Sequence, residues 1–229
     1  MRKTAGQEAG PSRFLLHTPS DRAPRILLLG AHPDDIEIGC GATVLSLLAV
    51  RPDVECRWIV FSGSGARRIE ALVSGRRFLR RAAKKEISVL TFRDSFFPDV
   101  AADIKAFFEQ LKAERSPDLI FTHQRDDRHQ DHRVISELTW NTFRNCCILE
   151  FEIPKYDGDL GHPNFFVPIA KGVAEAKVRG LMTSFPSQRS RHWFTPETFM
   201  GLMRLRGVES GSSASHAEAF HAHKIVFEP

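Results

Sequence analysis

Short apolar runs alternate along the chain with longer segments whose apolar side chains recur at helical spacing. One run, residues 26–29, has the length and continuity of a buried strand. Residues 100–115 instead repeat apolar side chains at i, i+3, i+4 and i+7 and are followed by a proline, which predicts an amphipathic helix. The apolar positions of that helix, which we expect in the core, are Ile104, Phe107, Phe108 and Leu111.

The same alternation continues through most of the chain. Strands are expected at residues 25–30, about 54–61, about 86–92 and 118–123, and helices at about 40–50, 67–83, 100–115 and 132–145. This order predicts βαβ units with right-handed crossovers. The predicted fold class is therefore α/β: a Rossmann-like, doubly wound and mostly parallel sheet in the order 3-2-1-4-5, with helices on both faces.

The two ends of the chain follow a different pattern. Residues 1–24 are polar and contain three prolines, so we expect a flexible N-terminal arm followed by a single domain over residues 25–229. Beyond about residue 146 the pattern is less regular. Helices are expected near residues 168–185 and 195–206, a flexible loop at 209–215 and a closing strand at 219–227.

Composition restricts the class of protein without identifying it. The chain is 42% hydrophobic and 26% charged, as globular proteins are, and no apolar run approaches the roughly 18 residues of a membrane span. The N-terminus lacks the apolar segment of a signal peptide, so a cytoplasmic location is expected. The net charge is +4, and the paired basic residues between Arg67 and Lys85 favour a solvated helix face over nucleic-acid binding.

Two polar clusters carry the candidate chemistry. The stretch GAHPDDIEIGCG, residues 30–41, follows the first strand, and THQRDDRHQDHR, residues 122–133, begins at the end of the fourth. In the expected order these strands are neighbours, so their carboxyl ends flank a crevice in which ligands bind. Ionisable groups are costly behind a buried strand unless a cation lies among them. The pattern therefore favours a metal site.

His32, Asp35 and His132 form the predicted ligand set. Two imidazoles and one carboxylate, with one position open for water, are the donors of a catalytic zinc ion (Zn²⁺). Pro33 stiffens the turn between the first two ligands. Asp34 cannot easily point the same way as Asp35, so we expect it to face the open position and act as general base.

Two further residues of the second cluster are assigned to catalysis. His129 is expected to stabilise an oxyanion or to protonate a leaving amine. Asp131 is expected to accept a hydrogen bond that orients one of the imidazoles, although an aspartate at a helix start serves equally well as a cap. Because a lone histidine at a strand end is more often structural than a ligand, the metal site is inferred from the whole set.

The pair AHPDDIEIGCG and HQDH is similar to the signature of the PIG-L/LmbE-like zinc-dependent N-deacetylases, a resemblance that extends over about residues 25–227. It implies that His32, Asp35 and His132 bind zinc, that Asp34 is the general base and that His129 is the oxyanion or acid histidine. Later stretches such as EIPKYDGDLG and HWFTPETF resemble a bacterial branch of this superfamily.

The resemblance also implies a substrate class. The expected reaction removes an N-acetyl group from a small amino-sugar-containing molecule, either free, nucleotide-linked or attached to a natural product. Arg67 and Asp94 are candidates for sugar recognition, as are Tyr156 and Asp157, whose loop is otherwise a plain Asp-Gly turn. Relatives that assemble make a homo-oligomer reasonable. One departure is Asp127, since some relatives have a tyrosine two residues before the first histidine of HxDH.

Two other classes of protein require motifs that this chain lacks. A redox dinucleotide-binding protein would need GxGxxG after the first strand, but Gly30, Gly39 and Gly41 have the wrong spacing. A serine hydrolase would need GxSxG, and SGSG at residues 62–65 is not that motif. Two alternatives require no motif that the chain lacks and stay open: a catalytically inactive zinc- or sugar-binding module, and a zinc amidase acting on a different acyl-amide.

Overall fold

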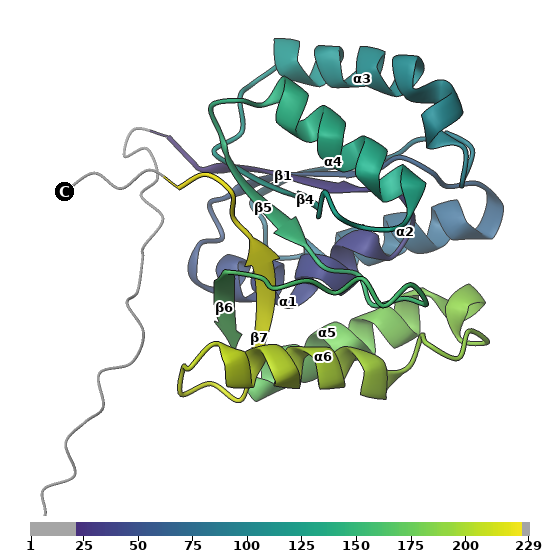
Figure 1. The fold of residues 1–229 in the computed structure, drawn as a ribbon. Helices are drawn as coiled ribbons and strands as arrows, with labels where there is room; N and C mark the ends of the chain where they lie inside the picture. The colour runs from purple at the N-terminus through teal and green to yellow at the C-terminus, as the bar shows by residue number, and fades with distance from the viewer. Residues whose placement is uncertain (1–21, 226–229) are drawn as a thin grey trace, which may run out of the picture.

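The structure, a computed structural model, describes residues 22–225. Its central feature is a seven-stranded sheet with the order β3-β2-β1-β4-β5-β7-β6 (Figure 1). The strands β1 to β5 are parallel, whereas β7 runs antiparallel to both β5 and β6. The predicted order 3-2-1-4-5 and the mostly parallel α/β class are therefore confirmed.

Strands and helices alternate along the chain as far as β5. The strands are β1 (Arg25–Gly30), β2 (Glu55–Val60), β3 (Lys84–Val89), β4 (Leu119–His123), β5 (Cys147–Phe151), β6 (Phe165–Ile169) and β7 (His216–His221). The α-helices are α1 (Asp35–Val50), α2 (Gly65–Phe78), α3 (Ala101–Ala113), α4 (Gln130–Thr142), α5 (Lys171–Ser184) and α6 (Pro196–Glu209). Short 3-10 helices cover η1 (Phe97–Val100) and η2 (Pro186–Gln188).

Alternate side chains of the central strands enter two cores, one on each face of the sheet. In β1, Ile26 and Leu28 pack on the face covered by α1, α2, α5 and α6, while Leu27 and Leu29 pack on the face covered by α3 and α4 (Figure 1). The two-residue period of a strand produces this separation. Because helices cover both faces, the central strands are apolar on both sides.

Helix α1 begins at Asp35, earlier than residue 40, where the sequence predicted it. Gly39 and Gly41 weaken a helix prediction because each glycine costs about 1 kcal/mol relative to alanine. Their purpose here is close packing, since a Cβ at Gly39 would lie 2.3 Å from the Phe151 ring and one at Gly41 would lie 2.7 Å from the Phe78 ring. The two glycines thus lie within α1, which begins directly after the turn that follows β1.

The C-terminal part contains a strand that the sequence did not predict. The prediction places a helix near residues 168–185, but α5 begins at Lys171 and residues 165–169 form β6. Pro168 cannot donate a hydrogen bond to a neighbouring strand, a defect that is tolerated because β6 is at the edge of the sheet. The closing strand β7 begins at His216 and ends at His221, not over 219–227.

The predicted N-terminal arm lies mostly outside the described residues, as do residues 226–227 of the predicted closing strand. Near the end of that arm, Arg22 donates hydrogen bonds of 2.8 and 2.6 Å to the Asp118 carboxylate, just before β4. Over residues 22–225, none of the helices combines the length and the apolar character that crossing a membrane requires.

Candidate active site

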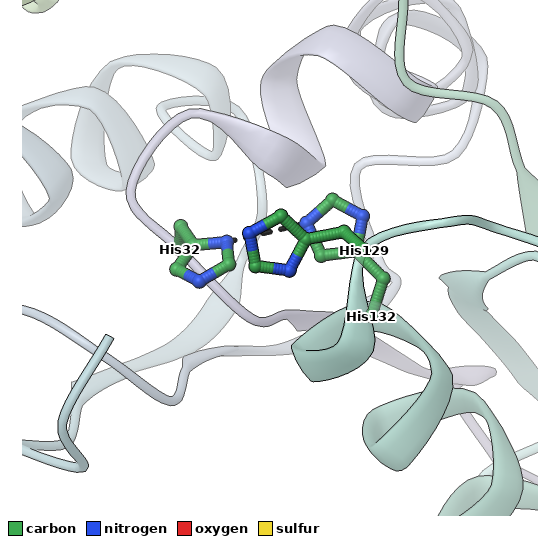
Figure 2. Close-up of side chains that lie close together, drawn as sticks. All are labelled: His32, His129 and His132. Carbon is green, nitrogen blue, oxygen red and sulfur yellow. Dashed lines mark hydrogen bonds between the residues drawn. The ribbon is translucent and has the colours of Figure 1, made fainter. Parts of the chain in front are cut away.

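The two polar clusters meet at the carboxyl ends of β1 and β4. These strands pair in parallel with Leu28 opposite Phe121, so the turn after β1 faces the loop after β4. Figure 2 shows the result: His32, from the first cluster, lies beside His129 and His132 from the second. The ring centroids of His32 and His129 are 4.8 Å apart, and those of His129 and His132 are 4.6 Å apart.

The three predicted ligands present their donor atoms as a compact triangle. His32 Nδ1 lies 3.2 Å from His132 Nε2, and Asp35 Oδ2 lies 3.5 Å from the former and 3.6 Å from the latter. A tetrahedral ion with bonds of about 2.0–2.1 Å separates its ligand atoms by roughly 3.3–3.4 Å. The triangle could therefore hold a zinc-sized divalent cation with little rearrangement, leaving the fourth position open.

The turn that shapes this triangle is conformationally strained. Asp34 has a φ of 97°, in a region that side chains other than glycine rarely adopt and that costs about 1–3 kcal/mol. The His32 amide donates a 2.6 Å hydrogen bond to Asp35 Oδ2, which closes the turn. Asp34 and Asp35 are thereby directed to different partners, as their adjacency in the sequence suggested.

The two predicted imidazole ligands differ in charge. Burial alone would lower the pKa of His32, but Asp131, Asp35 and Asp94 raise it well above the ordinary value. Burial instead lowers the pKa of His132 to about 3, so this imidazole is neutral at physiological pH and offers a lone pair. The carboxylates around His32 thus stabilise one positive charge, which a metal ion could supply in place of the proton.

Asp34 is buried, and within residues 22–225 the side-chain cation that forms an ion pair with it is Arg67. Burial raises the pKa of Asp34 to about 7 even though the guanidinium lies 3.2 Å away. The same guanidinium donates a hydrogen bond of 2.5 Å to the Pro33 carbonyl and contacts Glu70 at 3.4 Å. Arg67, predicted to recognise substrate, is therefore directed largely at protein groups around Asp34.

His129 occupies the N-cap position of α4, where its Nδ1 accepts the Asp131 amide N–H at 3.2 Å. Because that lone pair is taken, the neutral ring carries its proton on Nε2. Burial and the nearby charge of His32 both lower the pKa of His129. The surroundings therefore favour a neutral imidazole that can donate from Nε2.

Asp131 is fully buried and is not the cap of α4. Its Oδ2 lies 3.0 Å from His32 Nε2 and accepts the Ser95 amide at 2.6 Å, while Oδ1 accepts the Phe97 amide at 3.0 Å. The imidazole that Asp131 contacts is thus His32. The same carboxylate connects His32 to the loop between β3 and α3, which includes Ser95 at a φ of 69°.

Two buried residues next to the ligands were not predicted. His123, the last residue of β4, accepts the Ala31 amide at Nε2 (2.9 Å) and stacks on His132 with ring centroids 3.9 Å apart. Asp127 lies 2.9 Å from His132 Nδ1. No local pattern identifies these contacts. That of His123 with Ala31 depends on the pairing of β4 with β1, and those with His132 depend on the path of the loop between β4 and α4.

The residues predicted to bind substrate do not gather at one point. Asp94 has 68% of its side chain exposed and lies 3.3 Å from His32 Nε2; the hydrogen bond to His32 is the main cause that lowers the pKa of Asp94 to about 2. Tyr156 and Asp157 are exposed on the loop after β5, where the Tyr156 ring contacts that of His192 at 5.0 Å.

A cavity of about 650 Å³ lies at the opposite end of the sheet, where β1, β2 and β3 begin. Its lining includes Arg25, Glu55, Lys84 and Phe143 and none of the residues predicted to carry chemistry. The histidine cluster is therefore separate from this cavity.

Residues 27–143, just over half of the chain, match the PIG-L family of GlcNAc-PI de-N-acetylases. The chain therefore belongs to the PIG-L family. Among curated proteins, none matches the chain.

Several solved structures share the fold at low sequence identity. The conserved protein TT1542 from Thermus thermophilus has a TM-score of 0.69 and 19% identity over 89% of this chain and 97% of that chain. The N,N'-diacetylchitobiose deacetylase from Pyrococcus horikoshii has a TM-score of 0.65 and 21% identity over 91% of this chain and 86% of the deacetylase chain. The 4-carboxy-2-hydroxymuconate hydratase GalB from Pseudomonas putida has a TM-score of 0.67 and 14% identity over 90% of this chain and 98% of the hydratase chain. A hydratase and a deacetylase thus share this fold, so the fold alone does not define a reaction.

Proposed function

We propose that this protein is a zinc-dependent hydrolase that removes an N-acetyl group from an amino-sugar-containing substrate. The observation that carries the proposal is the triangle of His32, Asp35 and His132, whose donor atoms lie 3.2–3.6 Å apart beside the buried Asp34. Membership of the PIG-L family and the shared fold with a chitobiose deacetylase support the reaction and an amino sugar as the substrate class.

In this proposal His32 Nδ1, His132 Nε2 and an Asp35 oxygen hold the ion. Two nitrogens and one oxygen with an open position are typical of catalytic zinc sites. When bound, such an ion polarises the amide carbonyl and acidifies the attacking water.

Asp34 acts as the general base that removes a proton from the attacking water. Its pKa of about 7 suits a group that accepts a proton and then returns it. Arg67 supports this role because its guanidinium favours the ionised form of Asp34 and, by also binding the Pro33 carbonyl, restrains the turn.

His129 donates its Nε2 proton as a hydrogen bond to the oxygen of the amide carbonyl as negative charge develops there. A neutral imidazole is a good hydrogen-bond donor but a poor proton source, so the second role considered for His129, acid to the leaving amine, passes to Asp34. Asp34 returns the proton it took from water to the amine nitrogen as the C–N bond breaks. Acetate and a free amino sugar are the products.

The test is acetate release by the zinc-loaded protein over a panel of N-acetylglucosamine derivatives. Asp34→Asn and a chelated sample are assayed alongside. The chelated sample is expected to be inactive, and Asp34→Asn is expected to lose most of its activity while it still binds zinc. Stoichiometric zinc binding without acetate release from any acetamido sugar would favour an inactive zinc- or sugar-binding module. Release from simple acyl-amides but not from sugars would favour a zinc amidase of different substrate class.

A further inference from the structure

Asp127 is a fully buried carboxylate that the proposed reaction does not use. Its Oδ2 lies 2.9 Å from His132 Nδ1, and its Oδ1 lies 3.0 Å from the Lys155 ammonium and accepts the His129 amide at 2.8 Å. Both oxygens are thus engaged by protein donors. Asp127 therefore contacts the ring nitrogen of His132 that does not take part in the triangle.

Lys155 and Asp159 hold this arrangement from the loop that follows β5. The Lys155 ammonium lies between Asp127 and Asp159 Oδ2, which is 2.5 Å away. The same Asp159 oxygen accepts the Arg128 amide at 2.7 Å, and the Asp159 carbonyl accepts the Gln124 side-chain amide at 3.0 Å. Lys155 and Asp159, on either side of the Tyr156 and Asp157 that the sequence suggested for sugar recognition, thus fasten the loop between β4 and α4.

The proton of His132 must be on Nδ1 if Nε2 is to bind a metal ion. A carboxylate that accepts this proton selects the correct tautomer, fixes the plane of the ring and makes Nε2 more basic. Asp131 contacts His32 in a comparable way, at 3.0 Å from His32 Nε2, while His32 Nδ1 faces the triangle. Each imidazole of the triangle therefore has a buried aspartate on its other nitrogen.

We propose that Asp127, held in place by Lys155, is the positioning residue that orients His132 for metal binding. This inference rests on the proposed metal site. It also gives a role to the departure at this position, where some relatives have a tyrosine: here the side chain contacts a proposed metal ligand, His132, through the ring nitrogen outside the triangle.

The experiment measures zinc affinity of the full chain by competition with a chromophoric chelator, together with the absorption spectrum of the Co²⁺-substituted protein. Asp127→Asn and Lys155→Met are each expected to weaken zinc binding by about 10- to 100-fold and to alter the Co²⁺ spectrum. Lys155→Arg retains a cation beside Asp127 and is expected to retain most of the affinity.

Two control variants separate ligand positioning from loop stability. Glu150 is equally buried and holds the same loop by accepting the Arg125 amide at 3.1 Å, but it contacts none of the proposed ligands. Asp126 is an exposed carboxylate next to Asp127. Glu150→Gln and Asp126→Asn are expected to keep zinc affinity and the Co²⁺ spectrum close to those of the wild type, and thermal unfolding reports the folded state of every variant.

The outcomes distinguish this inference from the proposed function. Zinc affinity in Asp127→Asn equal to that in Asp126→Asn would overturn the positioning role while leaving the metal site intact. An equal loss in Asp127→Asn and Glu150→Gln would also overturn it, since the cause would be the loop and not the contact with His132. A wild-type protein that binds no zinc would overturn the proposed function itself.

Discussion

Replacing Arg67 with methionine tests how the candidate general base is kept ionised. The guanidinium is the side-chain cation in contact with Asp34, at 3.2 Å, and only about a quarter of the Arg67 side chain (27%) is exposed. Methionine retains much of the length and the apolar contact surface but removes the charge. We expect the pKa of Asp34 to rise, because burial and the charge of Asp35 then act on the carboxyl without the Arg67 guanidinium, which is the largest of the causes that lower this pKa.

The size of the effect follows from the contact. A neighbouring arginine lowers the pKa of a carboxyl by about 1 to 3 pH units. Once the pKa is above the assay pH, each further increase of the pKa by one lowers the ionised fraction of the carboxyl about tenfold. Asp34 has a pKa of about 7 with Arg67 present, so it is about half ionised at pH 7. At a pH below both pKa values, the variant should therefore lose roughly 10- to 1000-fold in kcat/KM, and the loss should shrink as the pH rises. A bound metal ion would lower the pKa of Asp34 in both the wild type and Arg67→Met. The predicted quantity is therefore the difference in this pKa between the two proteins.

The assay is the pH profile of kcat/KM for acetate release by metal-loaded wild type and Arg67→Met. Ser187→Ala is the control, because the Ser187 hydroxyl contacts Arg67 at 3.5 Å and Glu70 at 2.6 Å on the side away from Asp34. The acidic limb should move to higher pH in Arg67→Met alone. A limb that stays in place, with a raised KM at every pH, would refute this reasoning and return Arg67 to the substrate-binding role that the sequence suggested.

Three further predictions concern catalysis, packing and pH-dependent stability. Asp34→Asn should bind one zinc ion per chain yet release acetate about 10²- to 10⁴-fold more slowly, as metal analysis and acetate assays would show. Gly39→Ala should lower the free energy of unfolding by about 1–3 kcal/mol in urea titrations, because the added Cβ would overlap Phe151. Gly201→Ala is the control: a Cβ there would meet nothing within 4 Å, so this variant should be neutral or up to about 1 kcal/mol more stable. Equal effects of the two substitutions would refute the packing argument. The hydrogen bonds from Arg22 lower the pKa of Asp118 below 3.8, so this pair should stabilise the fold above that pH and cease to do so as the pH falls through the lowered value. Asp118→Asn should therefore be less stable than wild type at pH 7, and the gap should close in acid.

The sequence alone determined the features that depend on local periodicity. The helical spacing predicted α3 correctly, with Ile104, Phe108 and Leu111 buried and Phe107 half-buried in the same core. Side-chain direction repeats with the geometry of the backbone, so burial leaves a pattern that can be recognised without the fold. The strand order then placed the two polar clusters at adjacent strand ends, which is why His32, Asp35, His129 and His132 could be proposed together.

Only the tertiary structure decided which groups contact one another across those ends. Glycine has a low helix propensity, yet Gly39 lies inside α1. A glycine is needed at this position because the Phe151 ring leaves no space for a side chain. Arg67, in the first turn of α2, contacts Asp34 in the turn after β1, and Lys155 contacts Asp127 between two loops. Neither contact follows from a periodic pattern in the sequence. A loop takes its path from everything packed beneath it, and a change of a few ångströms in that path exchanges one partner for another. For this reason the candidate catalytic groups, and Asp131 as a partner of one imidazole, could be predicted from the sequence, whereas the contacts of Arg67 with Asp34 and of Asp127 with His132 could not.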